Sequence, residues 1–204
     1  MGNIDIFEAM ATKYDSLERI EMSKIIANEI RNHIVSGKEK IAIDYGCGTG
    51  LVGLELYNEF HSLLFVDAAK NMITLVQQKI KNNQIKNATA LCLDLESSMV
   101  PNFSGDYLLL VQVLLHVQDI EPFLRNLYEH LNNNGQILIV DFNYTESIIS
   151  DKVHNGFKQE NLMEIMEEIG FAEIKVKTFY HGKNNFMNQD ASLFLLDAKK
   201  IVKN

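Results

Sequence analysis

The chain has 204 residues, 47% of them apolar, and a formal net charge of −8 at pH 7. This length and composition are enough for one domain with a sizeable buried core. The acidic balance and the lack of any run of Lys or Arg argue against a nucleic-acid-binding surface and against binding to anionic membranes. No stretch approaches the roughly 20 apolar residues of a membrane-spanning helix, and residues 1–10 do not resemble a secretory signal.

Cysteine usage points to a reducing compartment. Only Cys47 and Cys92 occur, and neither has the spacing of a metal-ligand pair. We therefore expect reduced thiols, no bound metal and a cytoplasmic location. The expected partner is a small molecule rather than a nucleic acid or a membrane, and the chain is expected to be a monomer or a homodimer.

The first 36 residues predict helices. Apolar side chains recur at helical spacing at Ile25, Ile26, Ile30 and Ile34, which is typical of a helix with one buried face. This segment precedes the first strand-like run and is expected to form a helical lid.

From about residue 40 onward, segments rich in branched apolar residues alternate with segments of helical period. This alternation predicts a parallel sheet covered by helices. The expected strands are 40–45, 61–66, 88–93, 106–111 and 135–141. The expected helices are 50–59, 69–81 and 120–131. The last helix is expected to begin at an Asp119 cap and to be stopped by the run 132–135, because Asn and Gly tolerate a left-handed helix end.

The last third of the chain predicts a polar connection, a helix and a hairpin. The connection 143–158 is long for a compact domain and is expected to be a lid or a substrate loop. A helix follows at 159–169, and strands at 171–180 and 191–199 are joined by a polar loop, 181–190. These two strands predict an antiparallel hairpin on an otherwise parallel sheet.

The expected fold is therefore α/β. It has a doubly wound, mostly parallel sheet of seven strands with a C-terminal antiparallel hairpin, helices on both faces and an N-terminal helical lid. We expect one domain over 1–204, divided into the lid (1–36), a ligand-binding core (40–142) and the substrate loop, helix and hairpin (143–204).

Residues 41–50, which read IAIDYGCGTG, carry the strongest functional signal. Closely spaced glycines let the backbone approach a ligand and adopt positive φ angles. An apolar strand that feeds such a loop and then a helix is typical of a nucleotide or nucleoside pocket at the carboxyl end of a parallel sheet. Asp44, just before the first glycine, would repel a pyrophosphate and hold a cationic or amino-bearing ligand.

Two further acids end the next two strands. Asp67 closes the second expected strand, where a carboxylate can accept hydrogen bonds from two ribose hydroxyls. Asp94 closes the third, where it can accept from an adenine amino group while the N–H of Leu95 donates to a ring nitrogen. Both acids suit an adenosine.

A dinucleotide site is the main alternative at this loop. Gly48, Gly50 and Gly53 also satisfy the pattern G-x-G-x-x-G, although a lone match is weak. Asp44 disfavours a pyrophosphate there, and the expected terminal hairpin is not part of the six-stranded parallel dinucleotide fold.

Together, these motifs resemble those of class I S-adenosylmethionine-dependent methyltransferases of the small-molecule type. The resemblance covers about residues 7–200 and is carried by the acid and glycines of 44–50, by Asp67 and Asp94, and by the terminal hairpin. It implies a Rossmann-like fold, S-adenosyl-L-methionine as cofactor and S-adenosyl-L-homocysteine as product.

The resemblance also implies how the cofactor is held. Asp44 would hold the ammonium of the methionine moiety, directly or through water, and Asp67 would take the ribose hydroxyls. The other implied cofactor-binding residues are Gly46, Cys47, Gly48 and Gly50 under the methionine, Ala68 and Met72 at the adenine, Asp94 and Leu95 at the adenine edge, and Val111 and Gln112 beside the sulfonium. Residues 7–15 resemble the N-terminal helix that closes over the cofactor, which makes Tyr14 a candidate lid contact.

Methyl transfer needs a general base only when the acceptor must lose a proton. His116, after the fourth expected strand, and His154, in the polar connection, are the catalytic candidates. The alternative for each is that it satisfies local hydrogen bonds. Asp141, at the end of the fifth strand, is a candidate helix cap or substrate contact. Cys47 is more readily explained as a small packing residue than as a nucleophile.

The expected function is S-adenosylmethionine-dependent methyl transfer to an O, N, S or C centre of a small molecule. One alternative is a non-catalytic accessory or sensor protein that binds the same cofactor. A less favoured alternative is an NAD(P)-binding oxidoreductase.

Overall fold

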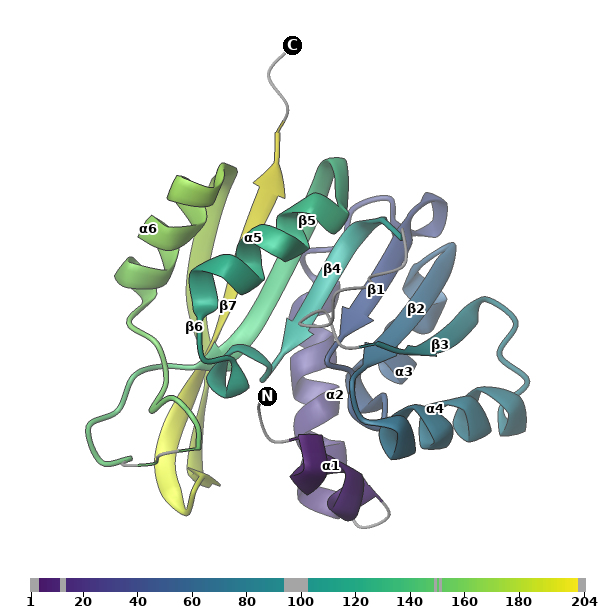
Figure 1. The fold of residues 1–204 in the computed structure, drawn as a ribbon, viewed down its shortest axis with the longest axis horizontal. Helices are drawn as coiled ribbons and strands as arrows, with labels where there is room; N and C mark the ends of the chain where they lie inside the picture. Colours follow the sequence, from purple (N-terminus) through teal and green to yellow (C-terminus); the bar gives the residue numbers. More distant parts are fainter. Residues whose placement is uncertain (1–3, 12–13, 94–102, 149, 151, 202–204) are drawn as a thin grey trace.

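A computed structural model describes residues 4–11, 14–93, 103–148, 150 and 152–201, and its centre is a seven-stranded sheet (Figure 1). The strand order is β3-β2-β1-β4-β5-β7-β6. The strands are β1 (Ile41–Tyr45), β2 (Ser62–Asp67), β3 (Ala88–Cys92), β4 (Gly105–Val111), β5 (Leu131–Phe142), β6 (Phe171–Phe186) and β7 (Gln189–Lys200).

The first five strands pair in parallel, whereas β7 runs antiparallel to both β5 and β6. The α-helices are α1 (Ile4–Met10), α2 (Leu17–Arg31), α3 (Leu51–Leu56), α4 (Lys70–Asn82), α5 (Ile120–His130) and α6 (Gln159–Ile169). Short 3-10 helices are η2 (Gly37–Glu39), η3 (Tyr57–Glu59) and η4 (Leu114–His116). The expected fold class is confirmed.

Helices cover both faces of the sheet because successive strand residues point to opposite sides. In β1, Ala42 packs in one core together with Ile30 of α2 and Val76 of α4. Its neighbour Ile43 packs in the opposite core together with Leu127 of α5 and, at the far end, α6. Because β1 to β5 pair in parallel, their carboxyl ends lie at the same edge of the sheet. Helix α1 and the tip of the β6–β7 hairpin also lie at this edge (Figure 1).

One expectation about helix α5 is confirmed and one is wrong. Asp119 occupies the N-cap position, as expected, although its side chain makes no capping hydrogen bond. The run 132–135 does not stop the helix, because the chain is already extended at Leu131, which pairs with Gly105 as β5 begins. Asn134 does adopt the left-handed conformation, with φ of 62°, but it does so inside the strand.

The C-terminal hairpin is longer than expected. The segment 181–190, expected as a loop, continues both strands, and the turn lies at Met187 and Asn188, both with positive φ. Helix α6 has the expected bounds and ends at Gly170, whose φ is 115°.

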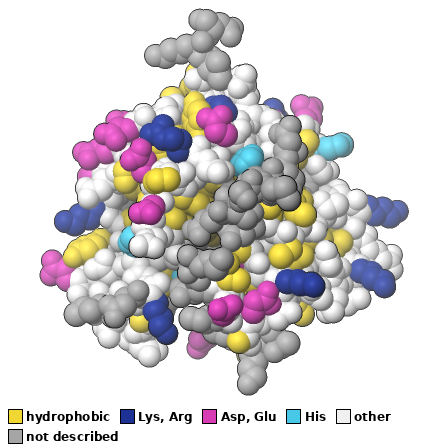
Figure 2. Space-filling view, in the orientation of Figure 1, with side chains coloured by type: hydrophobic (Ala, Val, Ile, Leu, Met, Phe, Trp, Pro, Cys, Tyr) yellow, Lys and Arg dark blue, Asp and Glu magenta, His cyan; other side chains and the backbone are white. Residues whose placement is uncertain are grey.

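The surface in Figure 2 is mixed in charge. Acidic side chains gather over α6, whose sequence carries Glu160, Glu164, Glu167 and Glu168, while Lys and Arg are scattered. No helix in the described ranges has both the length and the apolar character needed to cross a bilayer.

Candidate functional site

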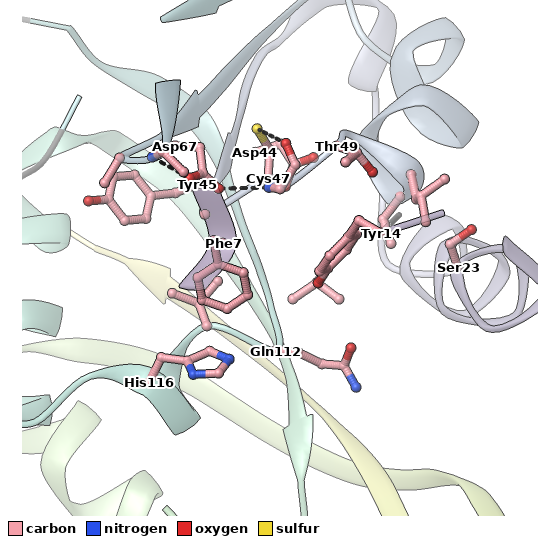
Figure 3. Close-up of a pocket in the computed structure, with 18 of the residues that line it drawn as sticks. Phe7, Tyr14, Ser23, Asp44, Tyr45, Cys47, Thr49, Asp67, Gln112 and His116 are labelled. Carbon is pink, nitrogen blue, oxygen red and sulfur yellow. Dashed lines mark hydrogen bonds between the residues drawn. The ribbon is translucent and has the colours of Figure 1, made fainter. Parts of the chain in front are cut away.

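A cavity of about 240 Å³ opens at the carboxyl edge of β1, β2 and β4 (Figure 3). Its floor is the glycine loop that follows β1, and α1 and the start of α2 cover it. Crevices outside the carboxyl ends of parallel strands, where the strand order reverses, are the usual ligand sites of open α/β sheets. Here the order reverses between β1 and β4.

The glycine loop needs its glycines for backbone geometry. Gly46, Gly48 and Gly50 have φ angles of 68°, 54° and 78°. A Cβ on Gly46 would lie 2.6 Å from the Val113 side chain, so the loop also approaches the end of β4 closely. Cys47 donates its N–H to the carbonyl of Val66 (3.0 Å), which ties the loop to β2. Burial raises the pKa of the Cys47 thiol well above its usual value, so the thiol stays protonated and is not a nucleophile.

Asp44 is the most unusual group in the cavity. Its side chain lines the cavity, the residue is 3% exposed, and Oδ2 has no hydrogen-bond partner among the described residues. Burial and, secondly, the charge of Asp67 raise its pKa to about 7, an effect that the N–H of Gly53 partly opposes. Burying a carboxylate oxygen without a partner costs free energy. A cation placed in the cavity beside Asp44 would recover that cost.

Asp67 lies at the end of β2 and is tied to the loop. Its Oδ2 accepts the N–H of Gly48 and its Oδ1 accepts the N–H of Ala69, both at 2.8 Å. Burial raises its pKa, while these two backbone donors oppose the rise. An ionised carboxylate has about four lone-pair sites, so each oxygen of Asp67 retains capacity for a ligand hydroxyl.

Helix α1 is tied across the cavity to α4. The Glu8 carboxylate accepts the N–H of Lys70 (2.5 Å) and of Asn71 (3.0 Å). The Nδ2 of Asn71 donates in return to the Glu8 carbonyl (3.1 Å). Helix α4 has Ala69 at its N-cap and no cap from its own sequence, so Glu8 satisfies its first N–H groups.

A second connection follows α1. The Asp15 carboxylate accepts a hydrogen bond from the Thr49 hydroxyl and forms an ion pair with Lys79 (2.7 Å). The Lys79 ammonium also donates to the carbonyl of Thr49 (2.7 Å). Between the two connections, Tyr14 lies over Gly48 and carries the Arg19 guanidinium 4.0 Å above its ring centre. Residues 4–11 and 14–15 are therefore held over the loop by contacts with α4 and with the loop itself.

His116 forms part of the opposite wall. It ends η4, and its ring packs edge-on against Phe7 at 5.1 Å between centres (Figure 3). Burial lowers the pKa of His116 to about 4, so the imidazole is neutral at pH 7. Gln112, at the start of the same connection, lines the cavity and has a φ of 54°. This conformation is uncommon for a side chain other than glycine and costs free energy of order 1 kcal/mol.

Comparisons with known proteins agree with this geometry. The family model described as "Methyltransferase domain" matches residues 42–135, which contain the glycine loop, Asp67 and η4. This match supports the resemblance of the chain to the class I S-adenosylmethionine-dependent methyltransferases.

The curated relatives of this chain are distant. A ubiquinone biosynthesis O-methyltransferase of Rickettsia akari is 27% identical over 139 residues, which is 66% of this chain and 54% of that protein. A malonyl-[acyl-carrier protein] O-methyltransferase of Bacillus cereus is 25% identical over 142 residues, 68% of this chain and 51% of that protein. The chain thus spans about half the length of these curated relatives.

The fold is also that of solved methyltransferases. An S-adenosylmethionine-dependent methyltransferase from Aquifex aeolicus superposes with a TM-score of 0.71 at 14% identity, covering 95% of this chain and 98% of that one.

Most of the residues expected to bind the cofactor come together around this cavity. Those that line it are Tyr14, Asp44, Gly46, Cys47, Gly48, Asp67, Ala68, Val111 and Gln112. Their chemistry fits S-adenosylmethionine, because a buried carboxylate without a partner suits an ammonium and a second carboxylate with spare acceptor capacity suits a ribose. Their individual contacts with the cofactor stay predictions.

Two expected cofactor residues lie elsewhere. Gly50 is the N-cap of α3, and a Cβ there would meet Val76 and Phe65 rather than the cavity. Met72 is fully buried beneath α1, in a small core with Ala11 and Ala69. Asp94 and Leu95, expected at the adenine edge, lie outside the described residues.

The two catalytic candidates separate. His116 lines the cavity, whereas His154 does not. The Nε2 of His154 lies 2.6 Å from the carbonyl of Val117. This hydrogen bond agrees with the alternative given for His154, that it satisfies local hydrogen bonds.

One wall of the cavity was missed by sequence reasoning. Arg19, Met22, Ser23 and Ile26 of α2 line it together. Their spacing of three, four and seven residues places them on one helix face. That periodicity is visible in the sequence, but it overlaps the apolar stripe of the same helix and gives no sign that the face borders a ligand.

Proposed function

We propose that the chain transfers the methyl group of S-adenosylmethionine to a small-molecule acceptor. The observation that carries this proposal is the buried Asp44 carboxylate, which lines a ligand cavity and whose Oδ2 has no hydrogen-bond partner among the described residues. A dinucleotide offers no cation at this position, whereas the cofactor of the family offers an ammonium.

The chain's own residues supply binding and alignment. Asp44 would hold the ammonium, Asp67 the ribose hydroxyls, and the lid formed by α1 and Tyr14 would exclude water from the cavity. When bound, S-adenosylmethionine supplies a methyl group on an excellent leaving group. Alignment of acceptor and donor is then the main task left to the protein, worth up to about 7 to 11 kcal/mol in ideal cases.

An oxygen acceptor is favoured among the O, N, S and C centres, because both curated relatives cited above are named as O-methyltransferases. We assign the acceptor-facing role to His116 rather than His154. A neutral imidazole at the cavity wall can accept a hydrogen bond from an acceptor hydroxyl, and its low pKa makes it a weak base. This suits an acceptor that needs orientation more than deprotonation.

Calorimetry with S-adenosylhomocysteine tests the proposal. We expect binding at tens of micromolar or tighter, and no binding of NADH. Asp67→Ala should weaken S-adenosylhomocysteine binding by at least about 1.5 kcal/mol, because two charge-assisted hydrogen bonds to the ribose are lost. Tight binding of NADH by folded protein, without S-adenosylhomocysteine binding, would establish the oxidoreductase alternative.

A further inference from the structure

The connection between β4 and α5 carries His116, and it is held by residues from outside it. It consists of Gln112, Val113, η4, Val117, Gln118 and Asp119. Its own hydrogen bonds are few: the N–H of His116 donates to the carbonyl of Val113 (2.9 Å), and that of Val117 donates to Leu114 (3.0 Å). The N-cap of η4, Val113, has no side-chain oxygen to offer the first N–H groups.

Asp141 supplies that cap from β5. Its Oδ2 accepts the N–H of Leu115 (3.3 Å), and its Oδ1 accepts the N–H of Phe142 (2.8 Å). The Leu114 N–H also lies close enough to favour the charged carboxylate. Asp141 is completely buried. Burying an acid costs free energy. Here the backbone N–H donors offset that cost, and the structure records no ion pair to Asp141 in the described ranges.

His154 holds the other end of the turn. Its backbone N–H donates to the carbonyl of Leu115 (2.8 Å), and its Nε2 lies 2.6 Å from the carbonyl of Val117. A carbonyl only accepts, so Nε2 carries the proton in this contact. The ring also packs against Phe157 at 5.4 Å between centres. One residue of the polar connection therefore contacts the turn on both sides of His116.

Asp141 and His154 thus bind successive peptide groups of one turn. Asp141 accepts hydrogen bonds from N–H groups at the start of the turn, and His154 donates to carbonyls at its end. Together they fix the orientation of His116, which lies between these contacts. Neither side chain reaches the cavity. From the sequence, Asp141 was a candidate helix cap or substrate contact, and His154 was a catalytic candidate with local hydrogen bonding as its alternative. The contacts agree with the cap for Asp141 and with local hydrogen bonding for His154.

We infer that Asp141 and His154 are positioning residues that hold His116 against the acceptor side of the cavity. The inference rests on the proposed function in one respect, that His116 faces the acceptor. It also gives the polar connection 143–158 a purpose: its contact with the turn makes the placement of His116 depend on the conformation of that connection.

Histidine ring resonances test this directly. Long-range ¹H–¹⁵N spectra of ¹⁵N-histidine protein, recorded from pH 5 to 8, report the tautomer and pKa of the His116 ring, assigned by its loss in His116→Gln. In the native chain we expect one neutral ring signal throughout. In His154→Ala we expect that signal to shift or split and the ring pKa to rise by about one unit or more, because a loosened turn admits water to the imidazole.

Rescue by His154→Gln separates positioning from general destabilisation, because its amide nitrogen can donate to the same carbonyl. We expect the native His116 signal to return in this variant. Asp141→Asn retains one acceptor oxygen and should perturb the signal less than Asp141→Ala. His181→Ala, on the exposed hairpin, is the matched control and should leave it unchanged.

The inference is overturned if the His116 signal and ring pKa in His154→Ala match those of the native chain, or if His154→Gln fails to restore them. Calorimetry with S-adenosylhomocysteine is run on the same samples. Absent binding to the native chain would refute the proposed function, whereas a His116 signal indifferent to residue 154 would refute only the positioning.

Discussion

Replacing Asp44 by asparagine tests two effects of this carboxylate, the free energy that its ionisation costs in the folded chain and its contribution to ligand binding. Burial raises the pKa of Asp44 from 3.8 to about 7, a change of about three units. At 1.36 kcal/mol per unit, ionising this group in the folded chain without a ligand costs about 4 kcal/mol, as an upper bound. The side-chain amide of the Asp44→Asn variant carries no charge and escapes that cost, although its own polar atoms stay buried.

The sign of the pH dependence follows from linkage. A group whose pKa is raised by folding stabilises the chain fully below its unfolded pKa, and that stability is lost as the pH rises through the folded value. For Asp44 the loss therefore runs from about pH 4 to about pH 7. We expect the unfolding free energy of Asp44→Asn, relative to the native chain, to increase by up to about 3 kcal/mol between pH 5 and pH 8. Asp141 has a similar pKa, but it contributes equally to both proteins.

Ligand binding should show the opposite dependence. An ammonium binds the ionised carboxylate, so binding below pH 7 must release a proton from Asp44. S-adenosylhomocysteine affinity should then rise by up to tenfold per pH unit between pH 5.5 and 7 in the native chain. In Asp44→Asn the affinity should be weaker and nearly independent of pH over this range.

Urea unfolding and calorimetry in buffers of different ionisation enthalpy measure both effects. Asp190→Asn, at an exposed acid beside the hairpin turn that does not line the cavity, is the control and should change neither slope. A native affinity that is flat from pH 5.5 to 7, or an Asp44→Asn variant that binds as tightly as the native chain, would refute the role of Asp44.

Three further variants test the lid and the loop. Glu8→Ala removes the cap that α1 gives α4. The dissociation rate of S-adenosylhomocysteine, measured by stopped flow, should rise about tenfold, as for one or two lost hydrogen bonds to a charged group. Asp5→Ala on the same helix is the control and should change this rate little. Lys79→Met removes the ion pair with Asp15 and should weaken binding by about threefold at low salt, and a similar loss in the exposed Lys81→Met would contradict this. Gly53→Ala places a Cβ against Asp44 and Phe65 and should lower the unfolding free energy in urea by about 2 kcal/mol, so equal stability would show that α3 can shift away from β1.

Local patterns predicted the elements well where one signal dominated. Helix α6 combines a helical apolar period with Gly170 at its end, and its observed bounds are the expected ones. The run 132–135 shows the limit of such signals. Asn and Gly there suit a helix end, but pairing of Leu131 with the neighbouring Gly105 extends β5 back through them. Tertiary pairing overrides local preference in this segment.

The candidate site was predictable to the extent that it lies near the strand ends. Asp44 and Asp67 follow directly from their positions at the carboxyl ends of β1 and β2, because the carboxyl ends of parallel strands meet at one edge. The contacts of Glu8 with Lys70 and of Asp15 with Lys79 join residues more than 60 positions apart. No periodicity encodes contacts of this kind. For Asp141 and His154 the sequence left both explanations open, since a strand-end acid and a loop histidine suit chemistry as readily as local backbone hydrogen bonds.

The place of β7 has a consequence for the order of folding. This strand is the last of the seven in sequence, yet it lies between β5 and β6. During synthesis from the N-terminus, β5 and β6 emerge with no neighbour on their facing edges until residues 189–200 are made. Pairing that joins distant residues is slow, and unpaired edges recruit other chains. A nascent chain halted before residue 189 would therefore expose two open edges, so completion of the sheet has to follow translation of the hairpin.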